Sequence, residues 1–220
     1  VCLAVLLFCG VFCAAAAAET GVTSQEVNTV EDLVRYADSE LDVILTADIT
    51  LSSTLKWMMG VLDLNGHVLS ISSGGPVLKV SGEATLKDSN PSVVHTFTYQ
   101  ENAAWTLDAS PNTTAVNLAD FRLTEAKAAA PGTYHVKVCG GIITGGRTSG
   151  DGGGVYVESN GGTFTMEGGT IIGNTAGGNG GGIYVLEKST FIMTGGSIIG
   201  NYAANDGGGV YFANIQEGEA

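Results

Sequence analysis

The stretch GGGVYV at residues 152–157 returns as GGGIYV at residues 180–185 and as GGGVYF at residues 207–212. The steps between equivalent residues of the three copies are 28 and 27 residues. A second motif, a glycine pair followed by a residue and then isoleucine, keeps the same steps: GGII at 140–143, GGTI at 168–171 and GGSI at 195–198. A fixed period of this size is typical of repeat proteins, in which each unit is completed by stacking on its neighbours.

Each repeat contains three short β-prone pieces separated by Gly/Asn turns: Phe164–Met166, Thr170–Ile172 and Ile183–Val185, with Phe191–Met193 opening the next unit. The glycines would break any helix in this region. The pattern predicts an all-β fold, a right-handed parallel β-helix or solenoid, in which successive coils pair at about 4.8 Å. About six coils would make a stack on the order of 30 Å long.

Equivalent residues of successive coils should lie over one another inside such a stack. The predicted inward columns are Phe164 and Phe191; Met166 and Met193; Ile143, Ile171 and Ile198; and Val155, Ile183 and Val210. The alternate positions on the same pieces should point to solvent.

The rest of the chain divides by composition. Residues 1–18 carry no charge and end in an alanine run, which is typical of a secretory signal peptide whose basic start is missing; the alternative is a short membrane anchor. Residues 19–41 are expected to form an N-terminal cap with a helix over Thr29–Ala37, capped by Thr29 and carrying an apolar stripe of Val30, Leu33, Val34 and Ala37.

Residues 42–89 are predicted to form the first coils, from the β-rich segments Val43–Leu51, Val61–Ile71 and Val77–Leu86. Residues 90–132, with three prolines and several aromatic residues, interrupt this rhythm and predict an excursion from the stack, either a binding surface or a decorative loop. Residues 133–220 carry the glycine-rich repeats, and we expect further coils or a cap beyond them.

The net charge limits the classes of partner that the protein can bind, and the cysteine content limits the disulfides that it can form. The formal net charge is −13, which argues against nucleic acid and anionic lipid surfaces. Three of the four cysteines lie in the signal-like segment, so Cys139 has no partner for an internal disulfide. Packing, and not cross-linking, is therefore expected to hold the exported chain together.

Several of these motifs resemble those of known surface proteins. The run IIGNTA at 171–176 followed by GGIY at 181–184 resembles the paired repeats of polymorphic membrane protein adhesins, and so does IIGNYA at 198–203 followed by GGVY at 208–211. The chain is also similar to bacterial secreted surface proteins with right-handed, pectate-lyase-like β-helix repeats, whose opening resembles Leu45–Leu51 followed by LDLNGH at 62–67. The resemblance implies an adhesin-like protein at the cell surface or in the medium.

Three columns are candidates for chemistry. Tyr156, Tyr184 and Tyr211 should form an outward aromatic column, either a platform for sugar rings or a shield for the sheet. Asp151, Asn179 and Asp206 share another column, and Asn174 and Asn201 a third. Asp and Asn at such turns usually bond their own backbone; a glycosidase pair for Asp151 and Asp206, or a calcium site around Asn179, is the alternative.

These observations favour a non-catalytic, secreted or cell-surface scaffold that is adhesin-like or binds carbohydrate. The alternatives are a polysaccharide lyase or glycosidase on the same scaffold and an autotransporter passenger domain. Expected partners are host or environmental glycans or surface proteins, and not nucleic acid. No catalytic residue, cofactor or metal ligand is assigned, and the candidate ligand-binding residues are Tyr156, Tyr184 and Tyr211.

Overall fold

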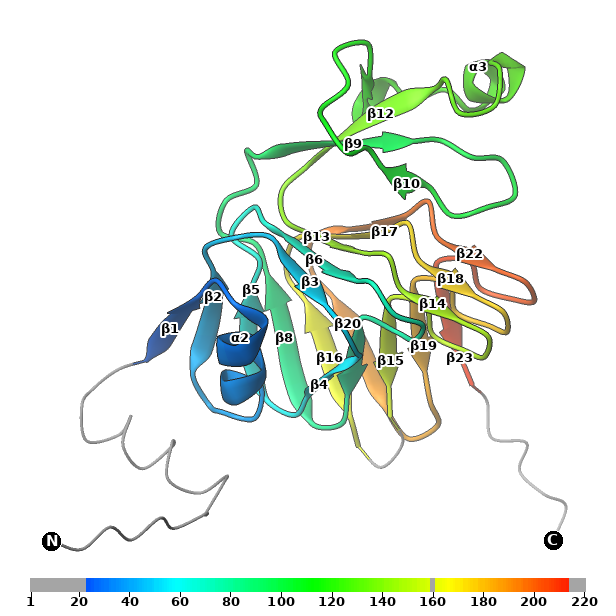
Figure 1. Ribbon diagram of the computed structural model, residues 1–220. Helices are drawn as coiled ribbons and strands as arrows, with labels where there is room; N and C mark the ends of the chain where they lie inside the picture. Colours follow the sequence, from blue (N-terminus) through cyan, green and yellow to red (C-terminus); the bar gives the residue numbers. More distant parts are fainter. Residues whose placement is uncertain (1–22, 159–160, 214–220) are drawn as a thin grey trace, which may run out of the picture.

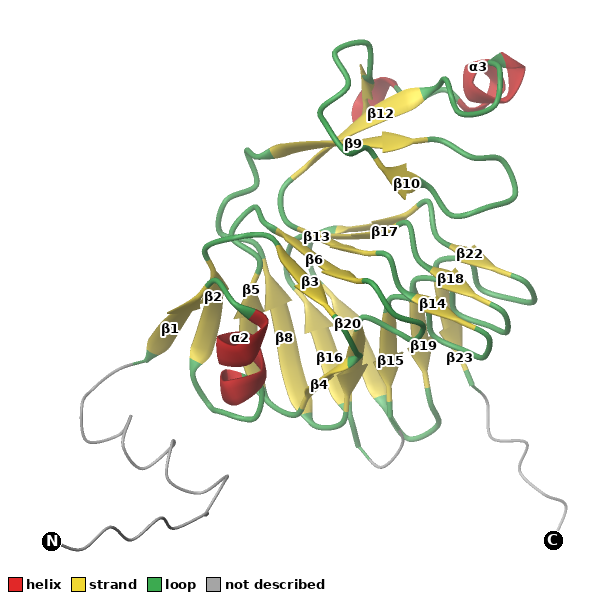
Figure 2. Ribbon diagram, in the orientation of Figure 1, coloured by secondary structure: helices red, strands yellow, loops and turns green. Residues whose placement is uncertain are grey.

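The computed structural model describes residues 23–158 and 161–213 (Figure 1). The segment 1–18, expected to be a signal peptide, lies outside the described residues. Strands dominate the fold, and only short helices accompany them (Figure 2). The expected all-β character is therefore confirmed.

Most of the described strands belong to four parallel sheets. The first sheet contains β1 (Ser24–Val27), β2 (Asp42–Leu45), β5 (Gly60–Asp63), β8 (Glu83–Lys87), β16 (Thr163–Met166) and β20 (Thr190–Met193). The second contains β3 (Ile49–Leu51), β6 (Val68–Ile71), β13 (Ile142–Thr144), β17 (Thr170–Ile172) and β21 (Ser197–Ile199). The third contains β4 (Leu55–Trp57), β7 (Leu78–Val80), β15 (Val155–Val157), β19 (Ile183–Val185) and β23 (Val210–Phe212). The fourth contains β14 (Arg147–Thr148), β18 (Thr175–Ala176) and β22 (Tyr202–Ala203).

The strand registers pair equivalent residues of the repeats. Val155 lies opposite Ile183, which in turn lies opposite Val210. The same column continues backwards, because Val155 also pairs with Leu78, and Leu78 with Leu55. The predicted like-to-like pairing is therefore confirmed, and it extends into strands of the N-terminal half whose sequences show no repeat.

Each long β-rich segment predicted within residues 42–89 divides into two strands. Val43–Leu51 was expected to be one piece, but it contains the end of β2 and all of β3, and the intervening Asp48 accepts a 2.9 Å hydrogen bond from the Val68 backbone N–H. Val61–Ile71 divides similarly at Asn65 and Gly66, whose φ angles are +45° and +79°. The Asn-Gly pair at residues 65 and 66 marks this second division in the sequence as a turn.

The inward columns form the main core. Phe164, Met166, Ile171 and Ile183 are almost fully buried, and Phe191, Ile198 and Val210 pack against them. Phe164 and Phe191 stack with their ring centroids 5.7 Å apart. Met193 pairs in register with Met166 as predicted, but it is 44% exposed because it lies on the outermost strand of its sheet.

The N-terminal helix α2 (Val30–Tyr36) begins as predicted. The Thr29 side chain accepts a 3.2 Å hydrogen bond from the Asp32 backbone N–H, which caps the helix. Leu33 and Ala37 enter the main core, whereas Val34, which was expected to share the stripe, is 56% exposed. Before the helix, β1 pairs in parallel with β2, an additional strand that the sequence did not predict.

The segment from residue 90 leaves the parallel sheets and forms a small sheet of its own. It contains β9 (Val94–Thr98), β10 (Thr106–Leu107), β11 (Val116–Asn117) and β12 (His135–Cys139), with a 3-10 turn η1 (Leu118–Asp120) and α3 (Leu123–Ala128) between β11 and β12. We call residues 90–139 the excursion. Because β9 and β12 pair antiparallel, the chain leaves and returns at neighbouring points, and β13 then pairs with β6 (Figure 1).

A second core joins the excursion to the outer side of the second parallel sheet. Phe97, Tyr99, Trp105 and Val136 are buried against sheet residues such as Ile172. Consecutive isoleucines of the repeat thus serve two cores, since Ile171 faces inward and Ile172 faces the excursion.

Candidate functional site

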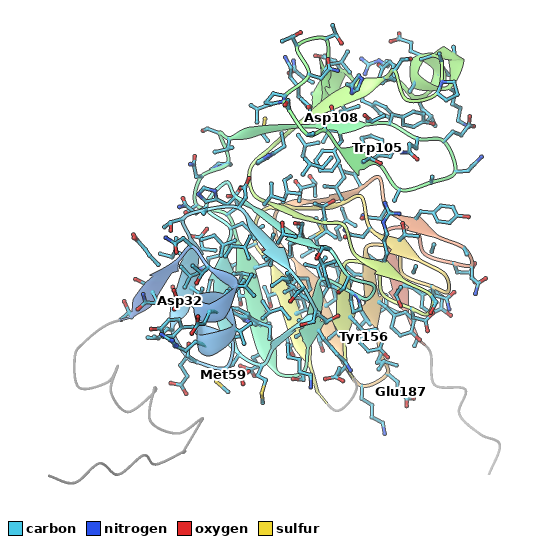
Figure 3. The ribbon with its side chains drawn as sticks, viewed as in Figure 1. Asp32, Met59, Trp105, Asp108, Tyr156 and Glu187 are labelled. Carbon is cyan, nitrogen blue, oxygen red and sulfur yellow. The ribbon has the colours of Figure 1, made fainter. Side chains whose placement is uncertain are left out.

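Tyr156, Tyr184 and Tyr211 form a single column on the third parallel sheet. Tyr156 pairs with Tyr184, and Tyr184 with Tyr211. Their neighbours Val155 and Ile183 belong to the core, so the alternation of the strands directs the tyrosines to the opposite face. Figure 3 labels Tyr156 within this sheet. The three candidate binding residues are therefore brought together, while their role in binding stays a prediction.

The tyrosine rings stack face to face. The centroids of Tyr156 and Tyr184 lie 5.3 Å apart with 24° between the ring planes, and those of Tyr184 and Tyr211 lie 5.6 Å apart with 7° between them. Tyr184, in the middle, is only 8% exposed. A stack of this kind covers the ring faces of its middle member, so the surface it offers to a ligand consists mainly of ring edges.

The first glycine of each triplet makes room for this column. Gly180 has φ +66°, and a Cβ there would lie 2.8 Å from Tyr184 Cβ. Gly207 has φ +65°, and a Cβ there would lie 2.7 Å from Tyr211 Cβ. Any larger residue would therefore be strained and would also clash with the tyrosine that follows. This contact explains why the glycines and the tyrosine recur together.

Charged groups flank the Tyr156 end of the column. Lys79 pairs in register with Tyr156, and its Nζ lies 5.6 Å from the ring centroid, within the range of a cation–π interaction. The same ammonium lies 2.6 Å from Glu158 Oε1. Lys79 therefore covers the remaining face of Tyr156 and is itself held by a carboxylate.

Burial raises the pKa values of Tyr156 and Tyr184 above the ordinary phenol value. For Tyr184 the nearby carboxylate of Asp151 adds to this effect, whereas for Tyr156 the ammonium of Lys79 acts against it. Both phenols therefore stay protonated at neutral pH. A protonated phenol can donate one hydrogen bond and accept others.

The column of Asp151, Asn179 and Asp206 has a role in the turns. Asp151 Oδ1 accepts hydrogen bonds from the Asn179 backbone N–H at 2.7 Å and from its side-chain amide at 3.2 Å. Asn179 Oδ1 accepts in the same way from the Asp206 backbone N–H at 3.1 Å. Asp151 and Asn179 thus each provide a hydrogen-bond acceptor for a backbone N–H in the turn of the next repeat. This is the structural role that Asp and Asn usually have at such turns, and it is the alternative to a catalytic role.

Asn174 and Asn201 form the predicted ladder at another corner. Asn174 is fully buried, and its Oδ1 accepts a 2.9 Å hydrogen bond from the Gly146 backbone N–H of the preceding repeat. Its amide donates to Ile143 O, to Ile172 O and to Asn201 Oδ1. One asparagine therefore links three successive repeats.

The excursion contains a polar group that the sequence did not reveal. His135 Nδ1 lies 2.9 Å from Asp108 Oδ2, and the Thr98 hydroxyl donates a 2.6 Å hydrogen bond to Asp108 Oδ1. Burial alone would raise the pKa of Asp108, but hydrogen bonds from Thr98, Thr96 and His135 outweigh it and lower that pKa. Thr98 also lies 3.2 Å from His135 Nδ1 and not near Nε2, where the nucleophile of a catalytic triad stands.

The excursion also forms a cavity of about 460 Å³ at its outer end, and this cavity is partly open to solvent. The cavity lies between α3 with the loop after it and the chain following β9, and its wall includes Tyr99 and Tyr134. These rings belong to a cluster with Trp105 and Phe121, in which the Trp105 and Phe121 centroids are 5.1 Å apart. Figure 3 shows Trp105 and Asp108 within the excursion, away from Tyr156.

Within residues 23–158 and 161–213, no three His, Cys, Asp or Glu side chains gather closely enough to hold a metal ion. In the same part of the chain, none of the helices has the length and apolar character needed to cross a membrane. The sequence matches no protein-family model, and it has no significant match among curated proteins or solved structures.

Proposed function

We propose that this protein is a right-handed parallel β-helix that acts outside the cell as a non-catalytic, adhesin-like scaffold, and that its tyrosine column binds a polysaccharide. The parallel sheets and the pairing of equivalent residues support the β-helix. The uncharged segment 1–18 and the resemblance to bacterial surface proteins support a secreted or cell-surface location.

The observation that carries the binding proposal is the regular spacing of the column. Three identical side chains follow one another at centroid distances of 5.3 and 5.6 Å along a rigid sheet. Equal groups at nearly equal intervals suit a ligand that itself repeats, because successive ligand units then meet the same contact. A sugar polymer running along the column fits this requirement, and its hydroxyl groups can exchange hydrogen bonds with protonated phenols.

The charge of the protein favours a neutral polymer. The net charge is −13, and Asp151 and Glu158 lie close to the column. The positive charge of Lys79 is compensated by Glu158 at 2.6 Å. An acidic polysaccharide would therefore meet a repulsive surface at low ionic strength.

A glycan array tests this proposal with a variant that changes the hydroxyls and keeps the rings. The triple substitution Tyr156→Phe, Tyr184→Phe and Tyr211→Phe should preserve the stack. It should weaken binding to a neutral polysaccharide by roughly tenfold or more, since each lost hydrogen bond contributes up to about 1.5 kcal/mol. Tyr36→Phe, which removes a hydroxyl from α2, is the matched control and should bind as the wild type does.

Tyr184→Ala gives a second measurement, because it opens a gap in the middle of the stack. Circular dichroism establishes whether each variant keeps its strands. If the folded variants bind neutral polysaccharides as the wild type does, the column is not the binding site. Release of unsaturated products from a polysaccharide incubated with the wild type would instead show a lyase and refute the non-catalytic proposal.

A further inference from the structure

The cavity of the excursion combines an apolar wall with a charged rim. Its apolar lining comes from Tyr99, Ala126, Ala129, Pro131 and Tyr134. Its volume of about 460 Å³ falls within the range of small-molecule sites in proteins. Because residues 99–101 and α3 are far apart in sequence, the cavity is formed by the fold of the excursion and not by a single loop.

The aromatic side of this cavity is rigidly held. Tyr99 is only 7% exposed and meets Tyr134 edge to face, with 6.4 Å between ring centroids. The backbone of the two residues is joined as well, since the Tyr99 N–H donates a 2.8 Å hydrogen bond to Tyr134 O. Trp105 and Phe121 pack behind these rings. A wall that is already ordered loses little conformational entropy when a ligand binds.

The rim offers a hydrogen-bond donor beside an acceptor. Lys127 Nζ of α3 lies 2.9 Å from Glu101 Oε1 on the opposite side, and both side chains remain about half exposed, at 48% and 45%. The hydrogen bond and charge of Glu101 raise the pKa of Lys127, so the ammonium stays charged. Gln100 is held in place, because its amide donates a 2.8 Å hydrogen bond to Thr106 Oγ1.

One polar group at this cavity has no partner within the described part of the chain. The Tyr134 hydroxyl is buried and makes no hydrogen bond there. Burying a hydroxyl without a partner is unfavourable, and most buried hydroxyls in proteins are paired. A ligand oxygen that enters beside Tyr134, with a small adjustment of the ring, would supply the missing partner.

We propose that this cavity binds a single neutral sugar residue. A sugar ring has an apolar C–H face, which suits the wall of Tyr99 and Ala129, and neighbouring hydroxyls that can accept from Lys127 and donate to Glu101 together. The paired charges of the rim disfavour a ligand with net charge, because either sign meets one repulsive partner. This inference rests on the cavity alone and is independent of the tyrosine column.

Titration with neutral monosaccharides tests the site, with glucose, galactose, mannose and N-acetylglucosamine as probes. Fluorescence of Trp105, which contacts Tyr99, and saturation-transfer NMR should both show saturable binding of at least one of them. Lys127→Met should weaken this binding roughly tenfold or more, because a charge-assisted hydrogen bond is lost. Lys56→Met, which changes an exposed lysine on β4 away from the excursion, should have no effect.

A second variant tests the cavity without touching the rim charge. Ala129→Phe should occupy the space beside the wall and abolish binding, while the triple tyrosine-to-phenylalanine variant of the column should retain it. The proposal is wrong if the folded wild type binds none of the four sugars, or if Lys127→Met and Ala129→Phe both bind as the wild type does. Tighter binding of glucuronate than of glucose would also refute it, because it would show a site for anions.

Discussion

Trp105 of the excursion lies directly against the backbone of Gly200 in the last described repeat. The Trp105 N–H donates a 2.8 Å hydrogen bond to Gly200 O, and a Cβ on Gly200 would lie 2.6 Å from two atoms of the indole ring. The equivalent Gly173 of the previous repeat has its own contact, since a Cβ there would lie 2.5 Å from Trp105 O. A chain segment that precedes the repeats therefore packs against two of them.

Gly200→Ala should loosen this contact. Gly200 has φ +62°, so alanine would be strained there and would also displace the indole. We expect the free energy of unfolding to fall by about 2–4 kcal/mol, measured by urea denaturation followed by tryptophan fluorescence. Gly132→Ala is the matched control, because Gly132 has φ +76° and open space around its missing Cβ. It should lose only about 1 kcal/mol, and an equal loss in the two variants would contradict the role of Trp105.

Asn174→Ala should be among the more damaging single substitutions in the repeats. It leaves the buried N–H of Gly146 and the carbonyls of Ile143 and Ile172 without their partner. We expect the free energy of unfolding, measured by urea denaturation, to fall by about 3 kcal/mol. Asn201→Ala, at the equivalent but partly exposed position, should lose less, and a larger loss there would show that burial does not set the cost.

The hydrogen bonds that Asp108 makes with Thr98 and His135 should make the free energy of unfolding depend on pH in the acid range. The pKa of Asp108 is lowered in the folded protein, so its contribution is fully present above the unfolded pKa of about 3.9 and is lost as pH falls through the folded value. The difference in unfolding free energy between the wild type and Asp108→Asn should therefore shrink below about pH 4. Asp38→Asn, an exposed site on the N-terminal side, corrects for the loss of one negative charge. A difference that stays constant with pH would contradict the assignment.

Tyr156 and Tyr184 of the column should ionise only at a more alkaline pH than an ordinary phenol does. The pKa values of Tyr156 and Tyr184 are higher in the folded protein than in the unfolded chain. Their contribution to the free energy of unfolding should therefore be fully present below the unfolded pKa of about 10 and be lost as pH rises through the folded pKa values. Lys79→Met should raise the pKa of Tyr156 further, since Lys79 favours the phenolate. Ultraviolet difference titration against Tyr156→Phe measures this, and a lowered Tyr156 pKa in Lys79→Met would contradict the arrangement.

The repeating part of the fold could be read from the sequence because one local rule recurs in it. Glycine and asparagine at fixed intervals mark the corners, and the residue after each glycine triplet faces the core, so the pairing of Val155 with Ile183 followed directly. The sequence also indicated that Asp151 and Asn179 serve turns, since these side chains bond to nearby backbone amides. The tyrosine column followed from the same alternation.

The excursion could not be read in this way, because long-range packing determines its pairings. β9 and β12 pair across many residues that have no period, and only this pairing brings His135 to Asp108. The contact of Trp105 with Gly200 was also hidden, since every repeat glycine has an explanation as a turn residue. The short strand β18 was missed for a related reason, because two residues after Asn174 are too few to form a pattern.

The asparagine ladder has a consequence for how such a chain can change its length. Asn201 gives Asn174 the same contact that Asn174 gives Gly146, because in each case the asparagine Oδ1 accepts a hydrogen bond from a backbone N–H of the preceding repeat, at intervals of 27 and 28 residues. A gene duplication that copied one whole interval would insert a unit whose upper and lower surfaces already fit their new neighbours. Deleting a single codon would instead move every later asparagine off its corner. Growth by complete units is therefore the tolerated route of variation in this molecule.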